Sequence, residues 1–256
     1  MELHYTPTFI SLDETVSTNQ YLQQLCNERG SQVAPLTTVT AEYQSAGKGQ
    51  RGNSWESEAG KNLLFSLVLY PTFIEARHQF LLSQIVSLSI KESLSRWSDE
   101  ITIKWPNDIY WREKKICGIL IENDLAGIHI GRCICGIGLN VNQTTFLSDA
   151  PNPVSLRQIT GQEEDRQKLL EDILQRIAIY YQSAEAEPYG AFAQEISVRY
   201  ARSLFRRRGY HPYEDANGRF RARLLRVEPD GRFVLEDEQG KECTYLFKEV
   251  QYLLES

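Results

Sequence analysis

A glycine-rich segment with two cationic side chains is the first part of the sequence that could do chemistry. Residues 47–52 are Gly-Lys-Gly-Gln-Arg-Gly, and such glycines let backbone N–H groups approach an anionic ligand. A dinucleotide-binding loop would open directly into a helix, whereas this segment leads through Trp55 into an apolar stretch typical of a strand. A P-loop would have glycine where Glu42 stands, and Ser or Thr directly after Lys48. The segment therefore predicts an anion-binding loop of another class, with a plain turn between strands as the alternative.

Two lysines and a carboxylate stand at the ends of predicted strands further along the chain. Lys104 is followed by Trp-Pro-Asn and then by Asp108, while Lys115 opens the next strand. The proline ends the first of these strands, since it cannot continue the ladder. Lysines beside a carboxylate suit a phosphoryl-transfer substrate, with Asp108 able to hold magnesium. The alternative is that Lys104 is an ordinary solvent-exposed strand end.

The elements that must position these groups follow from the apolar periodicity. Predicted strands are residues 8–12, 36–43, 62–70, 101–104, 115–122 and 127–141, the last broken near Gly136 and Gly138. One helix is predicted to begin after residues 17–19. Three further helices are predicted over residues 76–97, 166–181 and about 189–205. Turns at 217–218, 230–231 and 239–240 then predict a small all-β module. We therefore predict an α+β fold with a boundary near residue 203.

Composition is that of an ordinary globular protein, with 41% hydrophobic and 24% charged residues. No apolar run approaches the roughly 20 residues that span a bilayer, and the first residues lack the pattern of a secretory signal, so we expect a cytoplasmic protein. A net charge of −6 disfavours a dedicated nucleic-acid binder. The arginine cluster at 199–208 is interpreted as a solvated helix end.

Cysteine and histidine spacing predicts neither a disulfide framework nor a metal site. The five cysteines include no Cys-x-x-Cys pair, and the four histidines include no His-x-x-x-His spacing. We therefore expect reduced thiols, with Cys133 and Cys135 on one face of a strand.

With these segments in order, the sequence resembles the biotin protein ligase family. Five stretches carry the resemblance, and their order is far more specific than any one motif: 17–19 (Ser-Thr-Asn), 41–55, 104–108 (Lys-Trp-Pro-Asn-Asp), 115–122 and 136–142. The resemblance implies a mixed sheet flanked by helices in a biotin- and ATP-binding catalytic domain, residues 1–202. An SH3-like β-barrel would follow over residues 203–256. It implies a two-step ligase that makes biotinyl-5′-adenylate from biotin and ATP with Mg²⁺, then biotinylates a lysine of a carrier domain.

The resemblance also implies roles for individual residues. Lys115, Lys104 and Asp108 would act in catalysis, with Asp108 also helping to hold magnesium. The residues implied for biotin are Ser17, Thr18, Asn19, Gln44, Lys48, Gly49, Gln50, Lys115, Gly118, Gly136 and Gly138. Those implied for ATP and the adenylate are Lys48, Gln50, Arg51, Trp55, Asn107 and Asn140.

The sequence differs from the family pattern at two positions, and two alternative functions stay open. The resembling family commonly has arginine at positions 48 and 50, so Lys48 and Gln50 imply weaker retention of the adenylate. The catalytic pattern begins within twenty residues, which implies a ligase without an N-terminal DNA-binding segment and with no DNA or membrane partner. Whether the chain forms a homodimer stays open. The alternatives are a lipoate protein ligase, which shares the chemistry, and a non-enzymatic module that binds an acidic protein or RNA.

Overall fold

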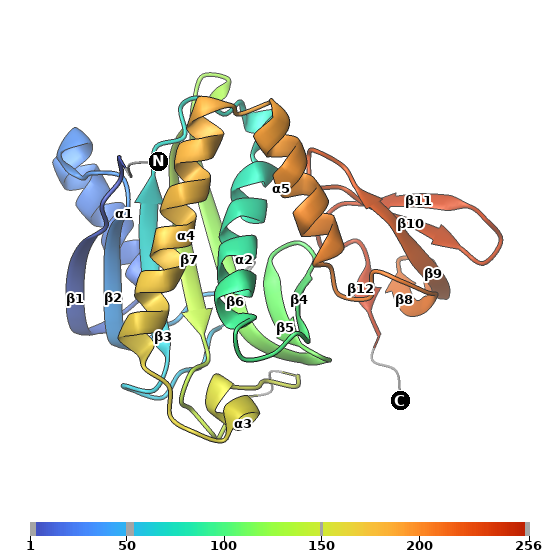
Figure 1. Ribbon diagram of the computed structural model, residues 1–256, viewed down its shortest axis with the longest axis horizontal. Coiled ribbons are helices and arrows are strands. Elements are labelled where there is room, and N and C mark those ends of the chain that lie inside the picture. Colours follow the sequence, from blue (N-terminus) through green and yellow to red (C-terminus); the bar gives the residue numbers. More distant parts are fainter. Residues whose placement is uncertain (1–3, 50–53, 149–150, 254–256) are drawn as a thin grey trace.

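A seven-stranded mixed sheet forms the larger part of the structure, a computed structural model that describes residues 4–49, 54–148 and 151–253 (Figure 1). The strand order is β1-β2-β3-β7-β6-β5-β4. Only β1 and β2 pair in parallel, and the other neighbours are antiparallel. The strands are β1 (Thr8–Thr15), β2 (Thr37–Gln44), β3 (Leu63–Leu69), β4 (Ile101–Lys104), β5 (Asp108–Trp111), β6 (Lys114–Ala126) and β7 (His129–Leu139).

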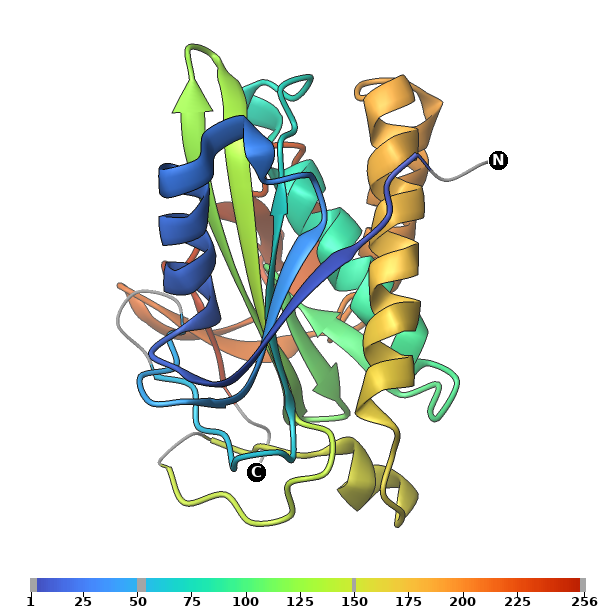
Figure 2. The same cartoon turned by 90° about the vertical axis from the view of Figure 1, so that its left-hand side faces the viewer.

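Helices cover both faces of this sheet. Figure 2 shows α1 on one face and α2 and α4 on the other. All seven residues of β3 are buried, as expected for a continuous apolar strand covered on both faces. The helices are α1 (Thr18–Arg29), α2 (Phe80–Leu94), α3 (Leu156–Thr160), α4 (Arg166–Ala186) and α5 (Ala191–Arg202), with short 3₁₀ turns at Gly30–Gln32 and Ala76–His78.

The C-terminal part is a second, antiparallel sheet in the order β11-β10-β9-β8-β12. Its strands are β8 (His211–Asp215), β9 (Gly218–Val227), β10 (Phe233–Asp237), β11 (Glu242–Tyr245) and β12 (Gln251–Tyr252). The α+β class with a C-terminal β module is confirmed.

Trp105 stacks on Phe233 with ring centroids 4.8 Å apart, and one hydrophobic cluster includes side chains from both sheets. The division at residue 203 therefore stays a prediction.

Several predicted elements differ from the structure. Gly136 and Gly138 do not break β7, because its neighbours β3 and β6 hold the ladder on both sides. The helix predicted over 76–97 begins only at Phe80 and ends at Leu94. Two short elements, β5 and α3, were not predicted. The residues of β5, Asp-Ile-Tyr-Trp, do not alternate between polar and apolar, and the five residues of α3 are too few to show a helical stripe.

The arginine cluster is also more structural than expected. Arg199 donates to Glu92 at 2.6 Å, and its Nη2 atom also contacts the Tyr180 hydroxyl. Arg206 is buried, with a side chain that is 3% exposed and an ion pair to Glu113 at 3.1 Å. The interpretation as a solvated helix end is therefore wrong for these two arginines. Among the described residues, none of the helices is long and apolar enough to cross a membrane.

Tyr180→Phe is expected to reduce the alkaline loss of stability. Burial and the hydrogen bond to Glu92 raise the pKa of Tyr180 to about 12 from its usual 10. The unfolded chain loses this proton first, so the free energy of unfolding falls as the pH rises from 10 towards 12. The variant lacks that proton and should lose less stability over this range. Urea unfolding at pH 9 and 11 checks this, with Tyr21→Phe on α1 as control, and equal losses in all three proteins would contradict it.

Candidate active site

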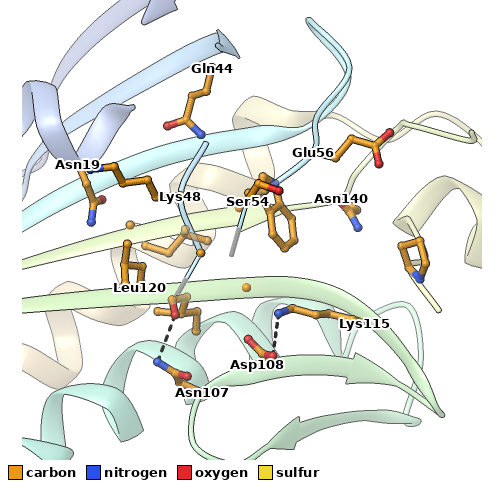
Figure 3. A pocket seen from close by; sticks show the side chains of 18 of the residues that line it. Asn19, Gln44, Lys48, Ser54, Glu56, Asn107, Asp108, Lys115, Leu120 and Asn140 are labelled. Atoms are coloured by element: carbon orange, nitrogen blue, oxygen red, sulfur yellow. Dashed lines mark hydrogen bonds and ion pairs between the residues drawn. The ribbon is translucent and has the colours of Figure 1, made fainter. Parts of the chain in front are cut away.

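A cavity of about 770 Å³ lies on the sheet face that carries α1, and such a volume is typical of small-molecule sites. Figure 3 shows Asn19 on one side of it and Lys115 with Asn140 on the other. The predicted residues that line it are Ser17, Thr18, Asn19, Gln44, Lys48, Gly49, Trp55, Asn107, Asp108, Lys115, Gly118, Gly136, Gly138 and Asn140. Gln50 and Arg51 fall outside the described residues.

The start of α1 forms a polar end of the cavity. Ser17 is the N-cap residue but makes no capping hydrogen bond with its side chain, which leaves the hydroxyl available to the cavity. The Thr18 N–H donates to Gln44 Oε1 at 2.7 Å. From β3, the Ser66 hydroxyl lies 2.7 Å from Thr18 Oγ1 and within bonding distance of Asn19 Oδ1. These contacts fix compact donors and acceptors in one place, which suits a neutral polar ring.

Glycines of β6 and β7 form the floor of the cavity. Gly118 and Gly138 are directly paired across the two strands, and Gly136 lies on the same face. A Cβ atom at Gly118 or Gly138 would collide with the Trp55 ring, and one at Gly136 would collide with the Asn19 amide. The indole of Trp55 therefore lies close against Gly118 and Gly138, and the Asn19 amide lies close against Gly136.

Lys115 and Asp108 form an ion pair at the other end. The distance from Lys115 Nζ to Asp108 Oδ2 is 2.7 Å, and both side chains are about 30% exposed. The carbonyl oxygen of Lys115 accepts from the N–H of Val154, and its N–H donates to the carbonyl oxygen of Asn152, each at 2.9 Å. These bonds fix the start of strand β6. A cation held this way can stabilise negative charge on a bound ligand.

Lys104 is not among the described residues that line the cavity, although its ladder partner Asp108 is. Its amine donates to the Tyr110 hydroxyl at 3.1 Å and lies 5.0 Å from the ring centroid of Tyr252. Burial lowers the pKa of Lys104, and Lys115 acts in the same direction, whereas Asp108 opposes the shift. The catalytic role suggested for Lys104 stays a prediction, since its amine faces aromatic rings.

Two asparagines stand near this end with fixed amides. Asn140 Nδ2 donates to Val154 O at 3.1 Å, and Asn107 Nδ2 donates to Ile119 O at 3.3 Å. Asn140 Oδ1 is buried without a hydrogen-bond partner among the described residues. A buried acceptor of this kind is costly unless a ligand donor satisfies it.

A family model described as the Biotin/lipoate A/B protein ligase family matches residues 12–140. The chain belongs to this family. The matched range contains every sequence-predicted residue that lines the cavity, from Ser17 to Asn140.

Relatives and solved structures extend the similarity beyond the matched range. "Bifunctional ligase/repressor BirA" of Bacillus subtilis is 28% identical over 235 residues, covering 87% of this chain and 69% of that protein. "Biotin--[acetyl-CoA-carboxylase] ligase" of Paracoccus denitrificans is 31% identical over 159 residues, covering 59% and 65%. A solved biotin protein ligase from Aquifex aeolicus, in complex with biotin and ATP, has a TM-score of 0.77 and 26% identity, covering 96% of this chain and 99% of that one.

Several residues around the site of this biotin/lipoate ligase family member were not found from the sequence. Ser66 stands alone in an apolar strand, where only its polarity could have marked it. Glu56, Phe146 and Ser148 line the cavity, and so does Phe247 of the C-terminal part. The last three lie beyond the matched range of the family, and no motif pointed to them.

Proposed function

We propose that the chain is an ATP-dependent biotin protein ligase. The observation that carries the proposal is the cavity, which has a fixed polar end and a lysine–carboxylate pair at its other end. The chain also resembles a solved ligase with bound biotin and ATP over 96% of its length. The names of the Paracoccus relative and of the Aquifex structure specify biotin, which supports biotin over lipoate. A binding module without catalysis would leave the Lys115–Asp108 pair without a role.

The first step is adenylation. A carboxylate oxygen of biotin attacks the α-phosphorus of ATP, and the bond from this phosphorus to pyrophosphate breaks, which gives biotinyl-5′-adenylate. Negative charge builds up on the α-phosphoryl oxygens, and Lys115 Nζ would stabilise it, since the ion pair with Asp108 already holds it at this end of the cavity. Lys104 would contribute charge from the neighbouring ladder position.

The two ends of the cavity would orient the two substrates. Ser17, Thr18, Asn19 and Gln44 would bind the ureido ring of biotin. The Trp55 indole lies over Gly118 and Gly138, so an approach of biotin to these glycines stays a prediction. Asn107, Asn140 and Trp55 would frame the adenine, and the open acceptor Asn140 Oδ1 fits an exocyclic amine. Lys48 and Gly49, which line the cavity, would contact the adenylate. The roles expected for Gln50 and Arg51 stay predictions, because these residues lie outside the described ranges.

Magnesium would enter with ATP. The described residues contain no cluster of three His, Cys, Asp or Glu side chains that could hold a metal ion. Asp108 is the carboxylate at the Lys115 end and could supply one oxygen, and Mg²⁺ commonly takes its other ligands from substrate phosphates and water.

The second step would transfer biotin to a protein. The amine of an acceptor lysine attacks the acyl carbon of the adenylate, AMP leaves, and an amide forms with loss of a proton from the amine. The acceptor would be the biotin carboxyl carrier domain of a carboxylase, in accord with the name of the Paracoccus relative.

We also propose that the protein is cytoplasmic, does not bind DNA and is able to form a homodimer. We propose that its catalytic domain comprises residues 1–202 and its C-terminal domain residues 203–256.

Pyrophosphate release with biotin and with lipoate, side by side, tests the proposal. We expect release that depends on ATP, Mg²⁺ and biotin, together with an adenylate detectable by mass spectrometry. Release with lipoate alone would favour the alternative ligase, and release with neither acid would overturn the proposal.

A further inference from the structure

A carboxylate at the edge of the cavity, Glu56, binds the backbone of a segment about 90 residues further along the chain. The N–H of Leu147 donates to Glu56 Oε1 and the N–H of Ser148 donates to Oε2, each at 2.8 Å. Gln143 Nε2 lies 3.4 Å from Oε1. Both carboxylate oxygens are therefore engaged by donors from one segment.

This segment, residues 143–148, is called the wall segment below. Its first residue is well anchored, because Gln143 is 1% exposed and accepts from the N–H of Glu58 at 2.9 Å and the amide of Asn62 at 2.6 Å. The far end has little apolar anchoring, since Leu147 is 87% exposed. Thr144 and Thr145 are held by bonds from Gln158 and Gln143, whereas the described backbone hydrogen bonds that hold Leu147 and Ser148 go to Glu56.

The wall segment contributes directly to the cavity. Phe146 and Ser148 line it, on either side of the two N–H groups that Glu56 accepts from. Glu56 follows Trp55 in sequence, and Figure 3 shows it on the same side as Asn140, apart from Asn19. The wall segment thus lies toward the end of the cavity that would hold the nucleotide.

The charge of Glu56 would be unfavourable there if it were free, because ATP is an anion. Burial would raise the pKa of Glu56, but hydrogen bonds from Ser148, Leu147 and Gln143 outweigh it and lower the pKa. The carboxylate is therefore ionised at neutral pH, and both of its oxygens accept from the wall segment.

We propose that Glu56 is a positioning residue for ATP: its carboxylate holds the wall segment in place, so that Phe146 and Ser148 are set before the nucleotide arrives. The inference rests on the proposed ligase function. Fixing the segment in advance removes an ordering cost from nucleotide binding. Biotin binding at the polar end, around Thr18 and Gln44, does not draw on this segment.

Glu56→Gln tests the proposal with almost no change in size. The amide keeps one acceptor oxygen but turns an NH₂ group towards the second backbone N–H. We expect the KM for ATP to rise about tenfold, with kcat and the Kd of biotin alone changed less than about twofold. Amide hydrogen exchange at Leu147 and Ser148 should become faster in the ligand-free variant. Glu56→Asp, which keeps both oxygens on a shorter stem, should recover part of the ATP affinity.

Glu58→Gln is the matched control, because it removes a negative charge from an exposed side chain two residues away. It should behave as wild type in all four measurements. If wild type makes no adenylate, the proposed function fails and the inference with it. If wild type is active but Glu56→Gln shows unchanged exchange, an unchanged KM for ATP, or equal losses for ATP and biotin, only the positioning role is overturned.

Discussion

Lys115→Ala is expected to lower adenylate formation by at least about a hundredfold while the chain stays folded. Lys115 Nζ is held 2.7 Å from Asp108 Oδ2 at the end of the cavity where the phosphoryl group would react. Removing a preorganised charge at a reacting centre acts on the transition state, whereas a partly exposed ion pair contributes at most about 1 kcal/mol to stability.

Lys114→Ala provides the control for this change, since Lys114 is the exposed neighbour on the same strand. Pyrophosphate release and thermal unfolding should be measured on both variants. Turnover at the wild-type rate in Lys115→Ala would remove Lys115 from the reaction. A collapse of the unfolding temperature in that variant alone would mean that the ion pair is structural.

Gly138→Ala is expected to weaken ligand binding by roughly tenfold to a hundredfold. The added methyl group would collide with Cε2, Nε1 and Cδ2 of Trp55, so the indole would have to move from its place over Gly138. Overpacking of this kind costs about 1–3 kcal/mol, and here the displaced side chain lines the cavity.

Gly131→Ala, on the same strand, is the matched control. Its methyl group would meet the Ala126 side chain at 3.0 Å, away from the residues that line the cavity, so binding should stay near wild type. Calorimetric titration with biotin and with ATP measures the effect. Undiminished affinity in Gly138→Ala would show that Trp55 moves aside without consequence.

Elements with a long periodic pattern could be predicted from the sequence. Helix α4 is one case, since its apolar stripe from Leu169 to Ile177 is buried throughout. The break expected in β7 was wrong, because a glycine weakens an isolated strand but pairing on both edges restores it. The glycines of the three predicted C-terminal turns, Gly218, Gly231 and Gly240, all have positive φ, which fits turn residues.

The candidate site could be located from the sequence because its polar residues come in compact motifs. Contacts between distant residues could not, since they depend on strand order: Ser66 reaches Thr18 only because β3 lies under the start of α1. The surroundings of Lys104 also depend on the fold. Its amine lies 4.7 Å from the ring centroid of Tyr110 and 5.0 Å from that of Tyr252, and its motif does not indicate these neighbours.

The stack of Trp105 on Phe233 joins the two sheets through one hydrophobic cluster. Trp105 Nε1 also donates to the carbonyl oxygen of Gly231 at 2.9 Å, and Phe247 places an aromatic ring from the C-terminal part in the cavity. A truncated chain that ends at residue 202 would therefore expose the indole of Trp105 to water and open one side of the cavity. By mass action, a ligand that fills the cavity should stabilise the small sheet as well as the large one, although the small sheet supplies few of the binding residues.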